Sequence, residues 1–203
     1  MNYPHVQFKL NKKLDEWTGK EFGIGSPSKV SSFYAKYQKD IVAFRNDTQI
    51  EWGEVSKYFF ELTKNIFSGC RWPEGKYLGY VSVFNCNPRF LSDKTFQVFY
   101  KHSAGPVYVT AHEMLHFIFY KYAIENHSNL FKNKDTENGI FWDVAEICNV
   151  VLLHDESFVK VHGVKKIICY PEHKKYISKL RKKWEINKDI DQLIISIYEA
   201  TQK

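Results

Sequence analysis

No apolar run in this 203-residue sequence approaches the length of about 18 residues that a membrane-spanning helix needs. The first residues, MNYPHVQFKLNKKLDEW, lack the apolar segment and small-residue cleavage site of a secretory signal. The four cysteines, at positions 70, 86, 148 and 169, form no CxxC pair, which excludes a zinc ribbon, and they are too few for a disulfide scaffold. We therefore expect a cytoplasmic protein with reduced thiols and no membrane partner.

Low-complexity segments, internal repeats and a recognisable interdomain linker are also absent. Hydrophobic residues make up 44% and aromatic residues 17% of the chain, which supplies a packed core and excludes overall disorder. The length fits one domain over residues 1–203. Within this domain we expect an N-terminal helical part over 1–70, a core over 77–154 that contains the sheet and the candidate metal-binding residues, and basic C-terminal helices over 160–203.

The order of patterns predicts an α+β fold that is mostly α. Apolar residues recur at helical spacing between positions 26 and 68, which predicts two helices, the second over about 50–67. Short aromatic and β-branched segments at 77–84 and 95–100 predict two strands of a small sheet. Helical patterns return over 106–124 and 140–153, and two more helices follow from about Pro171 and Lys188.

Positive charge is concentrated at the C-terminal end. Residues 160–203 hold eleven Lys and Arg against five Asp and Glu, so they carry the whole formal net charge of +6. A solvated helix face is the first interpretation of such a segment, and a surface for nucleic acid or another acidic partner is the second. The chain has no aromatic RNA-binding consensus to favour the second interpretation.

The strongest chemical signal is the sequence His112-Glu113-Met114-Leu115-His116. On a helix, residues four apart lie one above the other, about 6 Å apart along the axis, so both imidazoles could bind one zinc ion from the same side. Glu113 is rotated by about 100° from His112 and could reach a water molecule on that ion without being a ligand. Since bound zinc lowers the pKa of water towards 7, Glu113 is the candidate general base.

The surroundings of this motif strengthen the signal. The helix is apolar on nearly every side, which is typical of a buried helix. Burial of two histidines and a glutamate is costly without a strong partner, and a metal ion would be one. The alternative is a pair of core histidines that donate to backbone carbonyls.

A catalytic zinc site needs a third protein ligand and one open position. Glu146 is the candidate, since it lies in the otherwise apolar segment IFWDVAEICNVVLL, with Asp143 and Asn149 three residues away on either side. We expect Asp143 and Asn149 to orient the ligands. The rival third ligands are His127, in the loop that follows the motif helix, and His154, at the end of the next helix. The metzincin spacing is excluded, because Tyr122 stands where that family has its third histidine.

The pattern His112-Glu113-x-x-His116 followed by Glu146 on a downstream helix resembles the gluzincin branch of the zincin metallopeptidases, the thermolysin-like arrangement. The resemblance covers about residues 77–154 and implies a zincin-like domain, with a small sheet packed on the motif helix and a downstream ligand helix. It also implies that His112, His116 and Glu146 bind zinc and that Glu113 is the general base. The residue that steadies the oxyanion in this family has four candidates here: His154, His162, Tyr170 and His173.

The sequence thus predicts a zinc-dependent metallopeptidase acting on a peptide or protein substrate through a water molecule activated by Glu113. One alternative is a SprT-like protease with His127 as the third ligand. Another is a catalytically weak zincin-like regulatory or nucleic-acid-binding module that uses the basic C-terminal segment. The presence of Glu113 favours an enzyme, because a binding module has no use for a carboxylate beside two ligating histidines.

Overall fold

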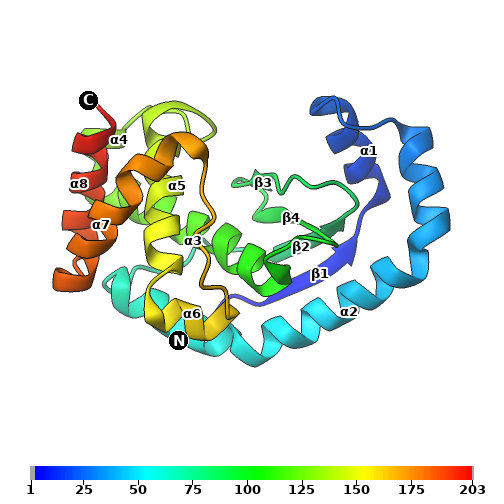
Figure 1. Ribbon diagram of the computed structural model, residues 1–203, viewed down its shortest axis with the longest axis horizontal. Coiled ribbons are helices and arrows are strands. Elements are labelled where there is room, and N and C mark those ends of the chain that lie inside the picture. Colours follow the sequence, from blue (N-terminus) through cyan, green and yellow to red (C-terminus); the bar gives the residue numbers. More distant parts are fainter. Residues whose placement is uncertain (1–2, 203) are drawn as a thin grey trace. The chain divides into compact units, whose positions relative to one another are not determined.

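The computed structural model describes residues 3–202 as a mostly helical chain with one small sheet, which confirms the α+β class (Figure 1). In chain order the elements are β1 (Val6–Leu10), α1 (Lys12–Glu21), α2 (Pro27–Ile66), β2 (Tyr77–Ser82), β3 (Arg89–Phe90), β4 (Thr95–Phe99), α3 (Gly105–Asn126), α4 (Ser128–Phe131), α5 (Gly139–Leu153), α6 (Glu156–His162), η1 (Pro171–His173), α7 (Lys174–Asn187) and α8 (Ile190–Thr201). Among these elements, no helix is both long and apolar enough to cross a membrane.

Contacts divide the described residues into two compact units, one formed by 3–57 with 74–113 and the other by 58–73 with 114–202. The first unit contains the sheet, in the order β1-β2-β4-β3 (Figure 1). β1, β2 and β4 run parallel, and the two-residue strand β3 pairs antiparallel with β4. Gly79 in β2 lies under the rings of Phe8 and Phe96, where a Cβ atom would stand 2.5 Å from the Phe8 ring. The central strand therefore needs glycine at this position.

A buried carboxylate joins the first two helices to the sheet. Asp15 of α1 is fully buried and accepts hydrogen bonds from Ser82 in β2, from Gln97 in β4 and from Tyr34 in α2, at 2.6, 3.0 and 2.7 Å. Burial raises the pKa of this carboxyl group, and the hydrogen bonds, that from Ser82 foremost, oppose the rise. Thr18, one turn further along α1, donates to Gln97 and completes the network.

Helix α2 is a single element, whereas the sequence predicts two helices over this region. It runs for 40 residues with one irregular residue, Tyr37, where φ is −117° and ψ is 17°. Ser26 precedes it, and its side chain accepts from the backbone N–H of Lys29 at 3.3 Å, as expected for a cap. Its C-terminal end is the expected Ser68-Gly69 stop, where both residues have positive φ and Gly69 donates to the carbonyl of Lys64.

The second unit is built around α5, which packs against α6, α7 and α8. Helix α5 is buried over most of its length, including Glu146 and Asn149, at 3% and 0% exposed. An aromatic cluster fills the space beside it, with the rings of Phe131 and Phe141 stacked at 4.3 Å and Tyr120 edge-on to Phe141 at 4.9 Å. This packing leaves α5 little freedom to turn about its axis, so the direction of the Glu146 side chain is set by the core.

Several elements match the sequence analysis, and several were not predicted from it. Strands β2 and β4 and helices α3, α5, α7 and α8 are confirmed close to their expected bounds. The short elements β1, α1, β3, α4 and α6 were missed. β1 is recognisable only through its pairing with β2, about 70 residues later in the chain, and a five-residue alternation alone is too weak a signal.

The Asp15 network yields a prediction for stability. Asp15→Ala leaves the buried donors of Ser82, Gln97 and Tyr34 without their acceptor, so we expect the free energy of unfolding to fall by about 3 kcal/mol. The exposed Asp47 of α2 provides a control, and Asp47→Ala should change that free energy by less than about 0.5 kcal/mol. Urea unfolding of the two variants measures the difference, and equal midpoints would show that the network does not stabilise the fold.

The end of α6 yields a prediction for pH. His162 donates through Nε2 to the carbonyl of Leu153 at 2.9 Å and accepts through Nδ1 from the N–H of Val164 at 3.0 Å, so the folded protein holds it neutral. Burial lowers the pKa of His162 below the ordinary value of about 6.5, and the hydrogen bond to Leu153 opposes part of this shift. The unfolded chain therefore binds more protons below about pH 6.5, and stability should fall as the pH drops through this range. Urea midpoints between pH 8 and pH 5 should decline less steeply for His162→Asn than for the parent protein.

Candidate metal centre

Two histidines one turn apart on α3 form the first part of the centre. α3 begins with Gly105, which has φ of 78°, and Pro106, whose fixed φ suits the first turn of a helix. From Tyr108 to Ala123 nearly every side chain is buried, so the polar residues of the motif are held among apolar ones. His116 is 0% exposed and Glu113 is 4% exposed, whereas His112 is half-buried. The helix thus fixes both imidazoles, and the His112 side keeps access to solvent.

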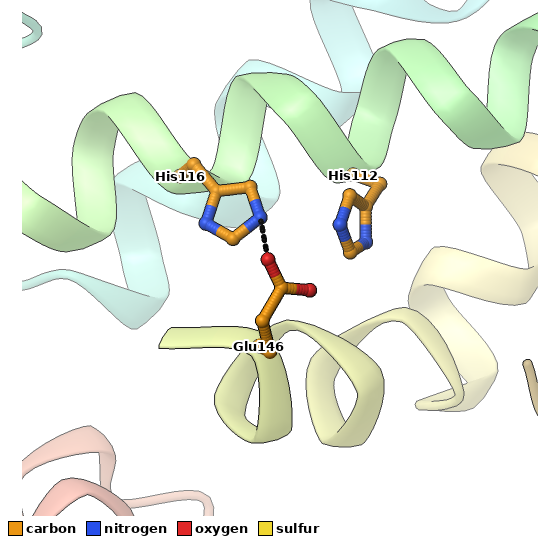
Figure 2. A group of neighbouring side chains, drawn as sticks. All are labelled: His112, His116 and Glu146. Atoms are coloured by element: carbon orange, nitrogen blue, oxygen red, sulfur yellow. Dashed lines mark ion pairs between the residues drawn. The ribbon is translucent and has the colours of Figure 1, made fainter. Parts of the chain in front are cut away.

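Glu146 on α5 completes the group. Figure 2 shows the rings of His112 and His116 hanging from α3 on one side and the Glu146 carboxylate rising from α5 between them. His116 Nε2 and Glu146 Oε1 are 3.2 Å apart. One potential ligand atom from each of the three residues lies within 4.8 Å of the others. The three residues therefore converge on one point, as the sequence analysis expects.

The arrangement can hold a metal ion. Donor atoms of a tetrahedral zinc site lie about 2.1 Å from the ion, and hence about 3.4 Å from one another. The distance of 3.2 Å between His116 Nε2 and Glu146 Oε1 is of this size, and all three candidate ligand atoms lie within 4.8 Å of one another. Two imidazole nitrogens and a carboxylate oxygen are also a donor set that divalent transition metals prefer. A bound cation would offset the cost of burying the Glu146 carboxylate at 3% exposure.

The rival third ligands are engaged elsewhere. His127 Nε2 lies 2.7 Å from Asp191, whose carboxylate also accepts from the hydroxyl of Tyr122. The ring nitrogens of His154 lie 2.7 and 3.0 Å from the carbonyl oxygens of Val150 and Lys166. Among residues 3–202 the histidine, cysteine and acidic side chains that gather as a potential metal site are His112, His116 and Glu146. The structure thus favours Glu146 over both histidines.

Asp143 has a different partner from the one expected. The sequence predicts that Asp143 orients a metal ligand. In the structure its carboxylate instead accepts a hydrogen bond from His173 Nε2 at 2.7 Å. His173 is 2% exposed and lies against the rings of Trp142 and Tyr170, so the pair joins η1 to α5 three residues before Glu146. The pairing was not predictable from sequence, since 30 residues separate the two side chains. Asn149 is fully buried on α5, and its role towards the ligands stays a prediction.

One histidine near the centre was not predicted from the sequence. His102 lies in the turn between β4 and α3, and its Nδ1 accepts from the N–H of Ala104 at 3.2 Å. Burial, together with the charge of His112, lowers its pKa. The neutral ring therefore carries its proton on Nε2. Its position three residues before the first residue of the motif helix is the only sequence signal that could have found it.

Comparison of the chain with protein-family models, with curated proteins and with solved structures finds no match.

The centre yields a prediction for metal affinity. His116→Ala and Glu146→Gln each remove a candidate ligand, so both should weaken metal binding by more than about 100-fold, the upper end of the effect of residues that only orient ligands. His127→Ala removes a buried histidine outside the group and should leave the affinity within a few-fold. Competition of each variant against a calibrated chelator at neutral pH measures these values. If His127→Ala loses the metal and Glu146→Gln keeps it, the third ligand is the loop histidine.

Proposed function

We propose that the protein is a zinc-dependent metallopeptidase whose zinc ligands are His112, His116 and Glu146. The observation that carries this proposal is the convergence of these side chains from α3 and α5, with a glutamate next to the first ligand in the sequence. Two histidines and one glutamate form the ligand set of catalytic zinc sites in several peptidases, and three protein ligands leave the fourth position open. Zinc bound there would act as a Lewis acid towards a water molecule and a substrate carbonyl.

Glu113 is the general base in this proposal. It follows His112 directly, so the helix rotates it by about 100° from the two ligands, beside the centre and not within the ligand set. Its side chain is 4% exposed, so it lies on the buried part of α3. The carboxylate would accept the proton of the attacking water and deliver it to the leaving amine.

Access to the centre supports an enzyme. His116 and Glu146 are buried, whereas His112 is half-buried, so one side of the group remains open to solvent. A purely structural zinc site is usually closed by four protein ligands. A metal ion held by these three side chains would keep one coordination position on the accessible His112 side. Hydrolysis requires such a position, because water or substrate must bind the ion there.

The thermolysin-like resemblance belongs to this proposal. It would make α3 the motif helix and α5 the ligand helix of a zincin-like domain, with β2 and β4 as the strands that precede the motif. Peptide bonds are the substrate class that the resemblance implies. In this proposal the ligands and the base determine the chemistry of hydrolysis and not the cleavage position.

The decisive variant is Glu113→Gln, which retains the shape of the side chain and removes its ability to accept a proton. We expect bound zinc within a few-fold of the parent and a fall in kcat of about 10²–10⁴. Glu125→Gln, an exposed change near the other end of α3, is the matched control and should leave kcat unchanged. Mass spectrometry of a peptide library incubated with each protein, with and without a chelator, measures the cleavage.

Three outcomes would contradict the proposal. The first is a Glu113→Gln variant as active as the parent. The second is protein purified without chelator that holds no transition metal by elemental analysis. The third is iron in place of zinc, because two histidines and one carboxylate also suit the ferrous centres of oxygenases.

A further inference from the structure

The outer face of α7 is a line of lysines. Lys175, Lys179 and Lys182 stand four and three residues apart, which places them in one row along the helix, and Lys174 and Lys183 flank this row. All five side chains are exposed. The opposite face of α7, formed by Ile177, Leu180 and Trp184, is buried against the rest of the second unit. We call the five residues the lysine row.

The lysine row has no acidic partners within the described chain. No ion pair joins any of its five residues to an acidic side chain of residues 3–202; the only acidic residue of α7, Glu185, lies 3.7 Å from Arg181. Like charges four residues apart, such as Lys175 with Lys179 and Lys179 with Lys183, destabilise a helix. The row therefore carries an electrostatic cost that an anionic partner would remove.

A small pocket lies at the C-terminal end of the same row. It has a volume of about 210 Å³ and lies between the end of α7 and the first turns of α8. Its walls combine apolar and amide side chains: Trp184, Ile186, Leu193, Asn187 and Gln192. Lys183 of the lysine row borders the pocket and donates to Ser196 there at 3.2 Å. Asp189 also borders it, and its carboxylate caps α8 by accepting from the N–H of Gln192.

The size and lining of the pocket suit one planar ring. Pockets for drug-sized ligands measure about 300–1,000 Å³, so 210 Å³ suits a smaller group such as a nucleobase. Ile186, which is 86% exposed, and Leu193 offer apolar contact for the face of a ring, and the amides of Asn187 and Gln192 offer donors and acceptors to its edge. A polyanion that carries a ring on each repeating unit fits both the row and the pocket.

We propose that α7 and the α7–α8 pocket bind single-stranded nucleic acid, with phosphates along Lys175, Lys179 and Lys182 and one base in the pocket. A positive track beside a site for a base is the general design of single-strand binding surfaces. A membrane surface fits less well, because Ile186 is the one large apolar residue exposed on this face and amphipathic anchors bury a whole apolar face. An acidic peptide would use the lysines and would have no ring for the pocket. This inference does not rest on the proposed peptidase activity.

The test uses the full-length protein and a fluorescein-labelled oligothymidylate of twelve nucleotides, with fluorescence anisotropy at several salt concentrations. EDTA is present, so that the result is independent of metal. Each phosphate contact with a single strand contributes about 0.7 to the slope of log affinity against log salt. The triple variant Lys175→Gln, Lys179→Gln, Lys182→Gln should lower this slope by about 2. The control Lys39→Gln, Lys57→Gln, Lys64→Gln removes the same charge from exposed positions of α2 and should leave the slope unchanged.

The pocket is tested separately from the charge. Ser196→Leu places a larger side chain in the pocket, and Gln192→Ala removes an exposed amide from its wall. Each should weaken binding by about tenfold, a typical effect of losing contacts to one base, while the salt slope stays as in the parent. Unchanged affinity in both variants would overturn the pocket as a base site.

Binding of other anionic partners distinguishes a single-stranded nucleic acid from the alternatives. Polyglutamate of matched charge and duplex DNA should bind more weakly than the single strand, because neither presents a free ring to the pocket. Equal affinity for either of them would overturn the proposal, and so would binding to phosphatidylserine vesicles without binding to the oligonucleotide. The Glu113→Gln variant should bind the oligonucleotide like the parent, so failure of the peptidase proposal and failure of this one are distinguishable.

Discussion

The burial of charged and polar groups between two apolar helices is the constraint around which the centre is organised. The middle of α3 and most of α5 are buried, and each has a few polar side chains facing inward, among them His116 and Glu146. An apolar interior tolerates a carboxylate only if donors or a cation surround it. The two imidazoles and the carboxylate meet this requirement together, because one metal ion could accept a lone pair from each of the three side chains.

Comparison of Glu146 with Asp15, another buried carboxylate, shows why the identity of the neighbours matters. Asp15 is surrounded by hydroxyl and amide groups, which donate to it and leave no position for an ion. Glu146 faces imidazole nitrogens, which can present either a proton or a lone pair. Only the second environment can change from a set of hydrogen bonds to a set of ligands. Similar burial therefore serves a hydrogen-bond network at Asp15, whereas at Glu146 it belongs to a group that could hold a metal ion.

The sequence predicted the features of the site that arise from local spacing. His112 and His116 are one turn apart in any helix, and Glu146 is recognisable as an acid in an apolar segment. The same local signals gave α3, α5, β2 and β4. Features that depend on distant pairing were not predictable. Strand β1 exists because it adds to β2, and Asp143 pairs with His173, although the sequence predicted that Asp143 orients a metal ligand. The sequence also predicted two helices over 26–68, whereas α2 is one helix, since a helix exposed on one side accepts polar residues within its length.

Helix α7 performs two separate physical roles on opposite faces. Its buried face packs against α5, the helix that carries Glu146, and so helps to fix the direction of the carboxylate. Its outer face carries the lysine row, which makes no ion pair with any described acidic residue and contributes nothing to that packing. Burial alone accounts for Ile177, Leu180 and Trp184. It does not account for five outward lysines on one side of a helix, since a mixture of charges would solvate that face without the repulsion. The two faces are therefore under different constraints, one from the core that supports the candidate metal centre and one from the mutual repulsion of the lysines, which the anionic partner that we propose would relieve.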